Sequence, residues 1–151
     1  MKIVLDASFA AAWILPDESS NDAEACLQKI LEGELEMVTT ALWHYEMCNL
    51  LNTAIRRKRL DEGSADSALG LLQQLPVGIH DHQQELWQRR LQILARRFGL
   101  SAYDAAYLEL ADRLQCPLRT NDNKLRAAAK QLGLAWYPRY SVRRIRRNPF
   151  Y

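Results

Sequence analysis

Short apolar runs alternate with longer helix-like segments along this 151-residue chain, and the alternation limits the folds that it can adopt. Residues 3–5 (Ile-Val-Leu) form a wholly apolar run, which is typical of a strand buried on both faces. Capping residues and Gly or Pro punctuate the helix-like segments between such runs. Strands separated by helices are typical of a mainly parallel sheet, so the sequence predicts an α/β domain.

The predicted elements follow in the order β-α-α-β-α-α-β-α-α-β-α-β. The predicted strands are residues 3–5, 37–39, 77–80, 118–120 and 134–137. The predicted helices are residues 7–15, 19–32, 41–58, 61–75, 81–98, 101–114 and 121–132. Since no long linker or internal repeat divides the chain, we expect one domain over residues 1–138 and a basic tail over residues 139–151.

Composition excludes several classes of protein. Apolar residues make up 48% and charged residues 25%, which is typical of a globular domain and not of a disordered chain. Three cysteines without a CxxC pair argue against a disulfide framework or a cysteine zinc site, so we expect the reducing cytoplasm. Asp6 and Pro16 bound the apolar start, and no run approaches the roughly 18 apolar residues of a membrane span. We therefore expect a soluble, non-secreted protein.

The net charge is only +2, but the charges are distributed unevenly. The first 50 residues hold nine acids and two bases, whereas the last 13 hold five arginines and no acid. Such a distribution suggests that one part of the protein gathers cations and another attracts a polyanion.

Three aspartates occupy positions where parallel sheets bind ligands. Asp6 follows the first predicted strand and Asp122 follows the fourth, while Asp104 lies in the first turn of a predicted helix. Ligands of open parallel sheets bind beyond the carboxyl ends of the strands. We therefore expect the three carboxylates to line one crevice.

Glu46 is a fourth candidate of a different kind. It lies four residues from both Leu42 and Leu50, so it shares their apolar helix face. An ionised carboxylate on such a face must be paired or must bind a metal, because uncompensated burial costs several kcal/mol or more.

Each acid also has a purely structural explanation. Asp6 and Asp122 can cap the helices that follow them, and Asp104 matches a capping box with Ser101. Glu46 can form a salt bridge with an arginine. What favours a site is that four acids on four elements are all placed where one crevice could gather them.

Four clustered carboxylates repel one another, and a divalent cation removes that penalty. Ligands that are all oxygen favour Mg²⁺ or Mn²⁺ over zinc or copper. Mg²⁺ keeps several waters when it is bound to protein, and such a water is a potential nucleophile. The quartet is therefore a candidate metal-dependent hydrolytic site.

Several segments in order along the chain resemble the PIN-domain family, and most of all its VapC-type toxins of bacterial toxin–antitoxin pairs. The segments are IVLDAS (3–8), WHYEMCNLL (43–51), LSAYDAAYLELADRLQCPLRTND (100–122) and DNKL (122–125). The similarity runs from residue 3 to about residue 137, and only the ordered set is specific, since each short segment is common by itself. The resemblance implies a three-layer α/β/α fold around a parallel sheet of four or five strands.

The resemblance also implies an activity, a metal and partners. It implies a ribonuclease that depends on Mg²⁺ or Mn²⁺, with a quartet that falls on Asp6, Glu46, Asp104 and Asp122 here. It implies a homodimer and a cognate antitoxin that covers the active-site groove. RNA is then the expected substrate and the cytoplasm the expected location. We expect no association with a membrane.

Three further polar residues are candidates for supporting the quartet. Ser8 and Thr120 match polar positions of the family's DxS and TxD segments. Asn49 is a candidate on the ground of helix geometry alone. It lies about one turn beyond Glu46 and could orient the Glu46 carboxylate.

Two other functions compete with the nuclease hypothesis. A phosphoacceptor or phosphotransfer domain also places acids after the first strand, but dehalogenase-like enzymes need an acid where Ser8 stands. Such domains also leave the helical Glu46 unexplained. A catalytically silent module of the same fold has no need of four mutually repelling acids.

The basic tail is a candidate RNA-binding segment, although a solvated tail or a segment that folds on a protein partner explains it as well. Its candidate RNA contacts are Arg143, Arg144, Arg146 and Arg147, with aromatic residues nearby. Deleting residues 139–151 is expected to weaken RNA binding and to reduce its dependence on salt, which a titration at several salt concentrations measures. An unchanged affinity and salt dependence would exclude the tail from the RNA site.

Overall fold

A computed structural model of the chain describes residues 1–80 and 86–136. Its strands are β1 (Lys2–Leu5), β2 (Glu36–Thr39), β3 (Val77–Ile79) and β4 (Leu118–Arg119). Its helices are α1 (Ala7–Ile14), the short 3₁₀ helix η1 (Pro16–Glu18), α2 (Asn21–Leu31), α3 (Leu42–Arg56), α4 (Glu62–Gln74), α5 (Trp87–Phe98), α6 (Ala102–Leu114) and α7 (Asn123–Gln131). The predicted order of elements is therefore confirmed from residue 2 to residue 131.

The four strands form one parallel sheet in the order β3-β2-β1-β4. Ile3 pairs with Met37 on one side of β1, and Val4 pairs with Leu118 on the other. The expected fifth strand over residues 134–137 is reduced to a single bridge between Leu118 and Ala135, and residue 137 lies outside the described part of the chain. A two-residue β4 leaves little edge for a neighbour to pair with.

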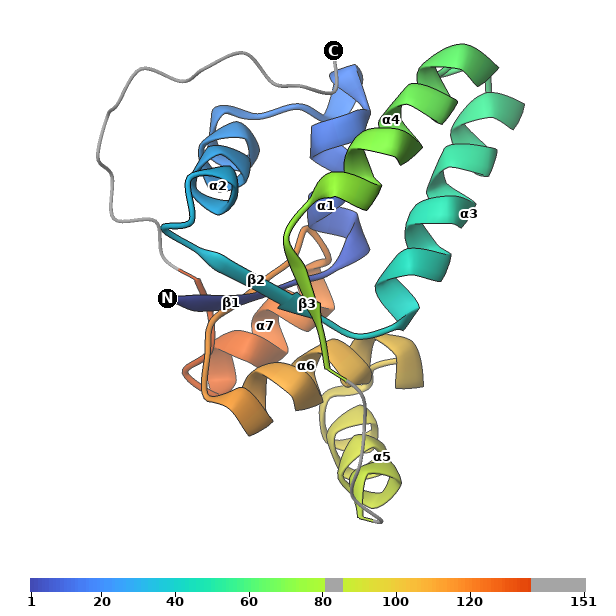
Figure 1. Ribbon diagram of the computed structural model, residues 1–151. Helices are drawn as coiled ribbons and strands as arrows, with labels where there is room; N and C mark the ends of the chain where they lie inside the picture. Colours follow the sequence, from blue (N-terminus) through green and yellow to red (C-terminus); the bar gives the residue numbers. More distant parts are fainter. Residues whose placement is uncertain (81–85, 137–151) are drawn as a thin grey trace.

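The sheet lies between two layers of helices (Figure 1). Helices α1 to α4 lie on one side, and α5 to α7 lie on the other, where α6 packs against α5, α7, β1 and β4. This is the three-layer α/β/α arrangement that the resemblance implied. Because helices cover both faces, the central strands must be apolar throughout, and Ile3, Val4 and Leu5 are completely buried.

The order of the strands places a switch point beside β1. From β1 the chain winds outward to β2 and β3, and it then returns to add β4 on the opposite side of β1. The connections after β1 and β4 lead to different helix layers. The chain segments beyond the carboxyl ends of these two strands therefore diverge and open a crevice. Asp6 directly follows β1 and Thr120 directly follows β4, which puts both at this crevice.

Polar side chains cap the starts of several helices. Ser20 accepts the N–H of Ala23 at the start of α2, and Asp61 accepts the N–H of Ser64 at the start of α4. Apart from α5, whose predicted start lies in part outside the described residues, the observed helices are one to three residues shorter than predicted, in part because a capping residue flanks the helix and does not belong to it.

Two expectations from composition can be compared with the structure. Cys26, Cys48 and Cys116 are all free, as the absence of a disulfide pattern predicted. Within residues 1–80 and 86–136, no helix combines the length and the apolar character that crossing a bilayer requires.

Two leucines on α2 test how much the core beneath the layer of helices α1 to α4 contributes to stability. Leu27 is 2% exposed and Leu31 is 52% exposed. Leu27→Ala is expected to lower the free energy of unfolding by about 2–5 kcal/mol, because it leaves a cavity in a packed core. Leu31→Ala is the matched control and is expected to change it by about 0.5 kcal/mol or less. Urea denaturation of both variants measures the difference, and equal losses would contradict the layer arrangement.

Candidate active site

Asp6 joins the ends of two neighbouring strands. Its side chain is 5% exposed and accepts the N–H of Phe9 at 3.0 Å, which caps α1. The hydroxyl of Thr120, just beyond β4, donates to Asp6 Oδ2 at 2.6 Å. Asp6 is thus both a helix cap and a member of the crevice, so the two explanations of this residue hold together.

Ser8 and Asn121 brace the same corner. The Ser8 hydroxyl lies 2.9 Å and 2.8 Å from the two carboxylate oxygens of Asp6 and 3.2 Å from the Thr120 hydroxyl. The backbone N–H of Asn121 donates to Ser8 Oγ at 2.9 Å, and the Asn121 amide donates to the Ser8 carbonyl at 3.1 Å. Ser8 and Thr120 therefore contact Asp6 directly, as their place in the sequence segments led us to expect.

Asp122 is tied to this corner through Thr120. Its backbone N–H donates to Thr120 Oγ1 at 2.9 Å, and its Oδ1 accepts the N–H of Leu125 at 2.7 Å, which caps α7. The residue is exposed, and no hydrogen bond within the described residues uses its second carboxylate oxygen.

Glu46 is half-buried on α3, and a side chain that the sequence analysis missed holds it. The Tyr107 hydroxyl, from the buried face of α6, donates a short hydrogen bond to Glu46 Oε2. The position of Tyr107 in the sequence could have identified it as a site residue, since it lies about one helical turn after Asp104 in a mostly apolar stretch. A buried tyrosine hydroxyl usually has a polar partner, which here is Glu46.

Asp104 lies at the start of α6 in the capping box that its spacing predicted. The hydroxyl of Ser101 donates to Asp104 Oδ2 at 2.7 Å and accepts the Asp104 backbone N–H at 3.0 Å. The residue is partly exposed, and its second carboxylate oxygen takes no bond within the described residues.

The carboxylates influence one another's ionisation. Burial raises the pKa of Asp6, and the charge of Asp104 adds to the rise, whereas hydrogen bonds from Thr120, Phe9 and Ser8 oppose it. Burial also raises the pKa of Glu46; the Tyr107 hydrogen bond opposes this, and the charges of Asp6 and Asp104 add to it. Three of the four predicted acids therefore lie within electrostatic reach of one another.

An open groove of about 560 Å³ connects Glu46 with Asp122, and Ser8, Asn49 and Asn121 also line it. The fourth predicted acid thus shares one groove with Glu46. Asn49 is exposed on the wall of this groove, one turn beyond Glu46, but the side chain bonded to Glu46 is Tyr107.

Arg59, a cation that lines the groove, already forms ion pairs with two acids. Arg59 Nη2 lies 2.7 Å from Asp17 and 2.6 Å from Glu18, both in η1. These ion pairs raise the pKa of Arg59 and leave the excess of negative charge around Glu46 uncompensated. The expected alternative for Glu46, a salt bridge to an arginine, is not formed within residues 1–80 and 86–136.

The residues present fit a divalent cation by ligand type and by charge. In the described part of the chain, no three His, Cys, Asp or Glu side chains already stand close enough to hold one ion. The donors are nevertheless all oxygen, and the neighbouring carboxylates add to the burial that raises the pKa values of Asp6 and Glu46, a repulsion that a cation would relieve. The buried Thr40 hydroxyl, directly after β2, lies beside the Tyr107 hydroxyl and adds one more oxygen to this side of the crevice.

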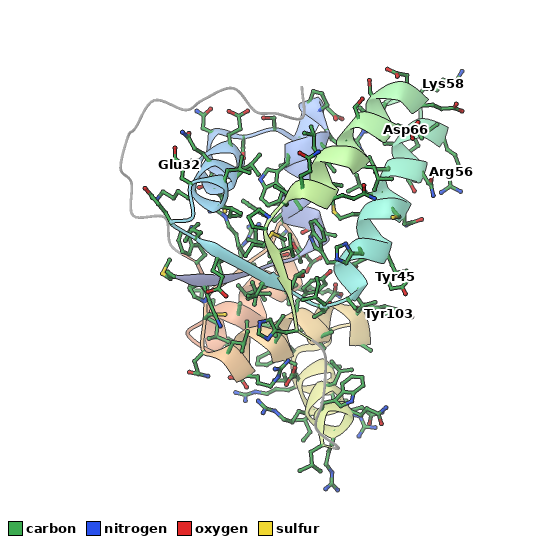
Figure 2. The ribbon with its side chains drawn as sticks, in the orientation of Figure 1. Glu32, Tyr45, Arg56, Lys58, Asp66 and Tyr103 are labelled. Carbon is green, nitrogen blue, oxygen red and sulfur yellow. The ribbon has the colours of Figure 1, made fainter. Side chains whose placement is uncertain are left out.

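Two exposed tyrosines stand beside the acids. Tyr45 precedes Glu46 on α3 and Tyr103 precedes Asp104 on α6. Figure 2 shows both at the place where the start of α3 approaches the start of α6. The remaining sequence candidates, Arg143, Arg144, Arg146 and Arg147 of the basic tail, lie outside the described residues.

Known proteins are similar to this chain in sequence and in fold. Residues 3–131 match the family model of the PIN domain. The chain is 34% identical over 125 residues to Ribonuclease VapC3 of Pyrobaculum aerophilum, an alignment that covers 83% of this chain and 92% of that protein. The fold is similar to the crystal structure of PAE2754 from Pyrobaculum aerophilum, with a TM-score of 0.59, 20% sequence identity, and coverage of 85% and 84% of the two chains.

The raised pKa of Glu46 predicts a stability effect with a definite sign. A carboxyl whose pKa is higher in the folded state destabilises the fold when it is ionised, and the penalty develops as the pH rises above the ordinary value of 4.5. Glu46→Gln, which keeps an acceptor for Tyr107, is therefore expected to raise the Tm at pH 7.5, by about 2–4 °C for each kcal/mol of penalty removed. The gain should vanish near pH 3.5.

Thermal unfolding in EDTA at both pH values measures this effect. Glu62→Gln is the control, because Glu62 is exposed in the first turn of α4, where a negative charge is favourable. A Glu46→Gln protein that is less stable than wild type at pH 7.5 would contradict the electrostatic description of the site.

Proposed function

Because this chain belongs to the PIN-domain family, we propose that it is a metal-dependent endoribonuclease that hydrolyses RNA phosphodiester bonds. The observation that carries the proposal is the meeting of Asp6, Glu46 and Asp104 within electrostatic reach, beside the switch point of the sheet. The similarity to Ribonuclease VapC3 over most of both chains supports RNA as the substrate.

Asp6, Asp104 and Asp122 are the proposed ligands of Mg²⁺ or Mn²⁺. When bound, such a cation supplies Lewis acidity that favours ionisation of water and stabilises negative charge on the phosphate. Ser8 and Thr120 fix the rotamer of Asp6 by direct hydrogen bonds, so this carboxylate is oriented before an ion arrives. The carboxylates of Asp104 and Asp122 are held less tightly, because among residues 1–80 and 86–136 each is bonded only at the start of its own helix.

Glu46 is proposed to orient the attacking water. Its Oε2 accepts from Tyr107, which leaves Oε1 as an acceptor for a water in the groove. Burial and the neighbouring charges raise the pKa of Tyr107, so the phenol stays protonated and remains a donor. Tyr107 is therefore a positioning residue for Glu46. In-line attack by water does not use the RNA 2′-hydroxyl, so a preference for RNA would come from shape and groove contacts.

The two competing functions are not favoured. A phosphoacceptor domain gives no role to the pairing of Glu46 on α3 with Tyr107 on α6. A silent binding module would gain stability by losing the carboxylates of Asp6 and Glu46, whose pKa values are raised, whereas both are present.

The proposal includes partners and a cellular role. We expect this chain to be the toxin of a toxin–antitoxin pair, inhibited by a cognate antitoxin that covers the groove, and to act as a homodimer. A cytoplasmic location agrees with an RNA substrate and with three free cysteines.

An RNA-cleavage assay with Asp104→Asn tests the proposed activity. The wild-type protein is expected to cleave single-stranded RNA with Mg²⁺ or Mn²⁺ and to stop in excess EDTA. Asp104→Asn keeps an oxygen acceptor for Ser101, so the protein should fold normally, and its turnover should fall by about 100-fold or more because a charge at the reacting centre is removed.

The control is Asp66→Asn, an exposed carboxylate on α4 that lies away from the groove (Figure 2). It should cleave RNA like the wild type. Activity that persists in EDTA, or Asp104→Asn turnover equal to that of wild type, would refute the mechanism.

A further inference from the structure

A second hollow, of about 490 Å³, lies at the β4 edge of the sheet. Its volume falls within the roughly 300–1,000 Å³ of small-ligand pockets. Three cationic side chains line it, Arg119, Arg126 and Lys130, against a single acid, Asp22. We call this hollow the basic pocket. Its charge is opposite to that of the groove at Glu46.

Arg119 is built into the floor of the basic pocket. The residue is 8% exposed, and its guanidinium lies 4.3 Å from the centre of the Phe9 ring and 5.7 Å from that of Trp136. It is paired with Asp22, the first-turn acid of α2. Burial lowers the pKa of Arg119 to about 10, which leaves it charged near neutral pH. Contacts with two aromatic faces hold this cation in place.

The other two cations are not neutralised. Arg126 uses Nε and Nη2 to donate to the Thr120 carbonyl at 3.4 Å and 3.1 Å, which fixes its guanidinium at the end of β4. Within residues 1–80 and 86–136, neither Arg126 nor Lys130 forms an ion pair with a carboxylate. Both are exposed on α7, so their charge is available to an anion.

The basic pocket and the acidic groove share a lining residue. Asn121 lines both hollows, and Thr120, which holds Asp6, lines the basic pocket. The two hydrogen bonds from Asn121 to Ser8 make this shared wall rigid. A chain of phosphates that passes over Asn121 therefore meets acids on one side and cations on the other.

We propose that the basic pocket is a substrate subsite that binds the phosphate next to the scissile one in single-stranded RNA. The inference rests on the proposed nuclease function, since the acidic groove is where the scissile phosphate would react. Acids alone would repel the RNA backbone, so a neighbouring cationic site is needed to hold the chain in register. Trp136 offers an aromatic side chain beside the cations, a combination that suits single strands.

Lys130 gives the sharpest test, because its side chain is exposed and takes part in no hydrogen bond or ion pair within residues 1–80 and 86–136, so its replacement should not affect folding. The probe is a fluorescein-labelled RNA 12-mer bound to the full chain in EDTA, which prevents cleavage, with affinity measured by anisotropy across a salt series. Lys130→Glu and Arg126→Ala are each expected to weaken binding and to reduce the slope of log K against log salt by about 0.7 for each phosphate that the variant no longer neutralises.

Lys58→Glu is the matched control, an exposed lysine at the far end of α3 (Figure 2). If Lys58→Glu weakens RNA binding as much as Lys130→Glu, or if Lys130→Glu binds like wild type, the subsite is refuted. Displacement of the RNA by polyglutamate as efficiently as by unlabelled RNA would also refute it, since the pocket would then suit an acidic protein.

Cleavage of the same RNA with Mg²⁺ or Mn²⁺ separates the two proposals. Cleavage by wild type together with unchanged affinity of Lys130→Glu would refute the subsite and leave the nuclease function standing. Specific loss of affinity in Lys130→Glu without any cleavage by wild type would refute the nuclease function instead.

Discussion

The hydrogen bond from Thr120 to Asp6 connects the two strands between which the chain changes direction. Asp6 ends β1 and Thr120 follows β4, so this bond closes the corner of the sheet where the crevice opens. Ser8, Asn121 and Asp122 are all bonded to this corner, Ser8 to Asp6, Asn121 to Ser8 and Asp122 to Thr120. The geometry of the proposed site therefore depends on a contact between residues 114 positions apart.

The fold tolerates an electrostatic cost at this corner. Burial and mutual repulsion raise the pKa values of Asp6 and Glu46, so ionised carboxylates at both positions oppose folding near neutral pH. Capping bonds at Asp6 and Asp122 offset part of this cost, because each of these aspartates accepts a backbone N–H at the start of a helix. The same side chains thus serve stability and, in our proposal, catalysis.

Opposite charges on the two sides of Asn121 divide the proposed work. The acidic groove would hold the cation and the reacting phosphate, while Arg119, Arg126 and Lys130 would hold the chain beside it. The uneven charge of the sequence suggested such a division, but the basic tail was its expected location. Within the described residues, the cations of the basic pocket instead come from β4 and α7.

Local patterns in the sequence determined the strands, the caps and the positions of Asp6, Asp104 and Asp122, because apolar runs and capping residues act within a few residues. The tertiary structure alone decided that Tyr107 holds Glu46, that Arg119 packs between Phe9 and Trp136, and that residues 134–136 form one bridge and no full strand. These contacts depend on how helices rotate and pack on the two faces of the sheet, and spacing along the chain does not specify that rotation.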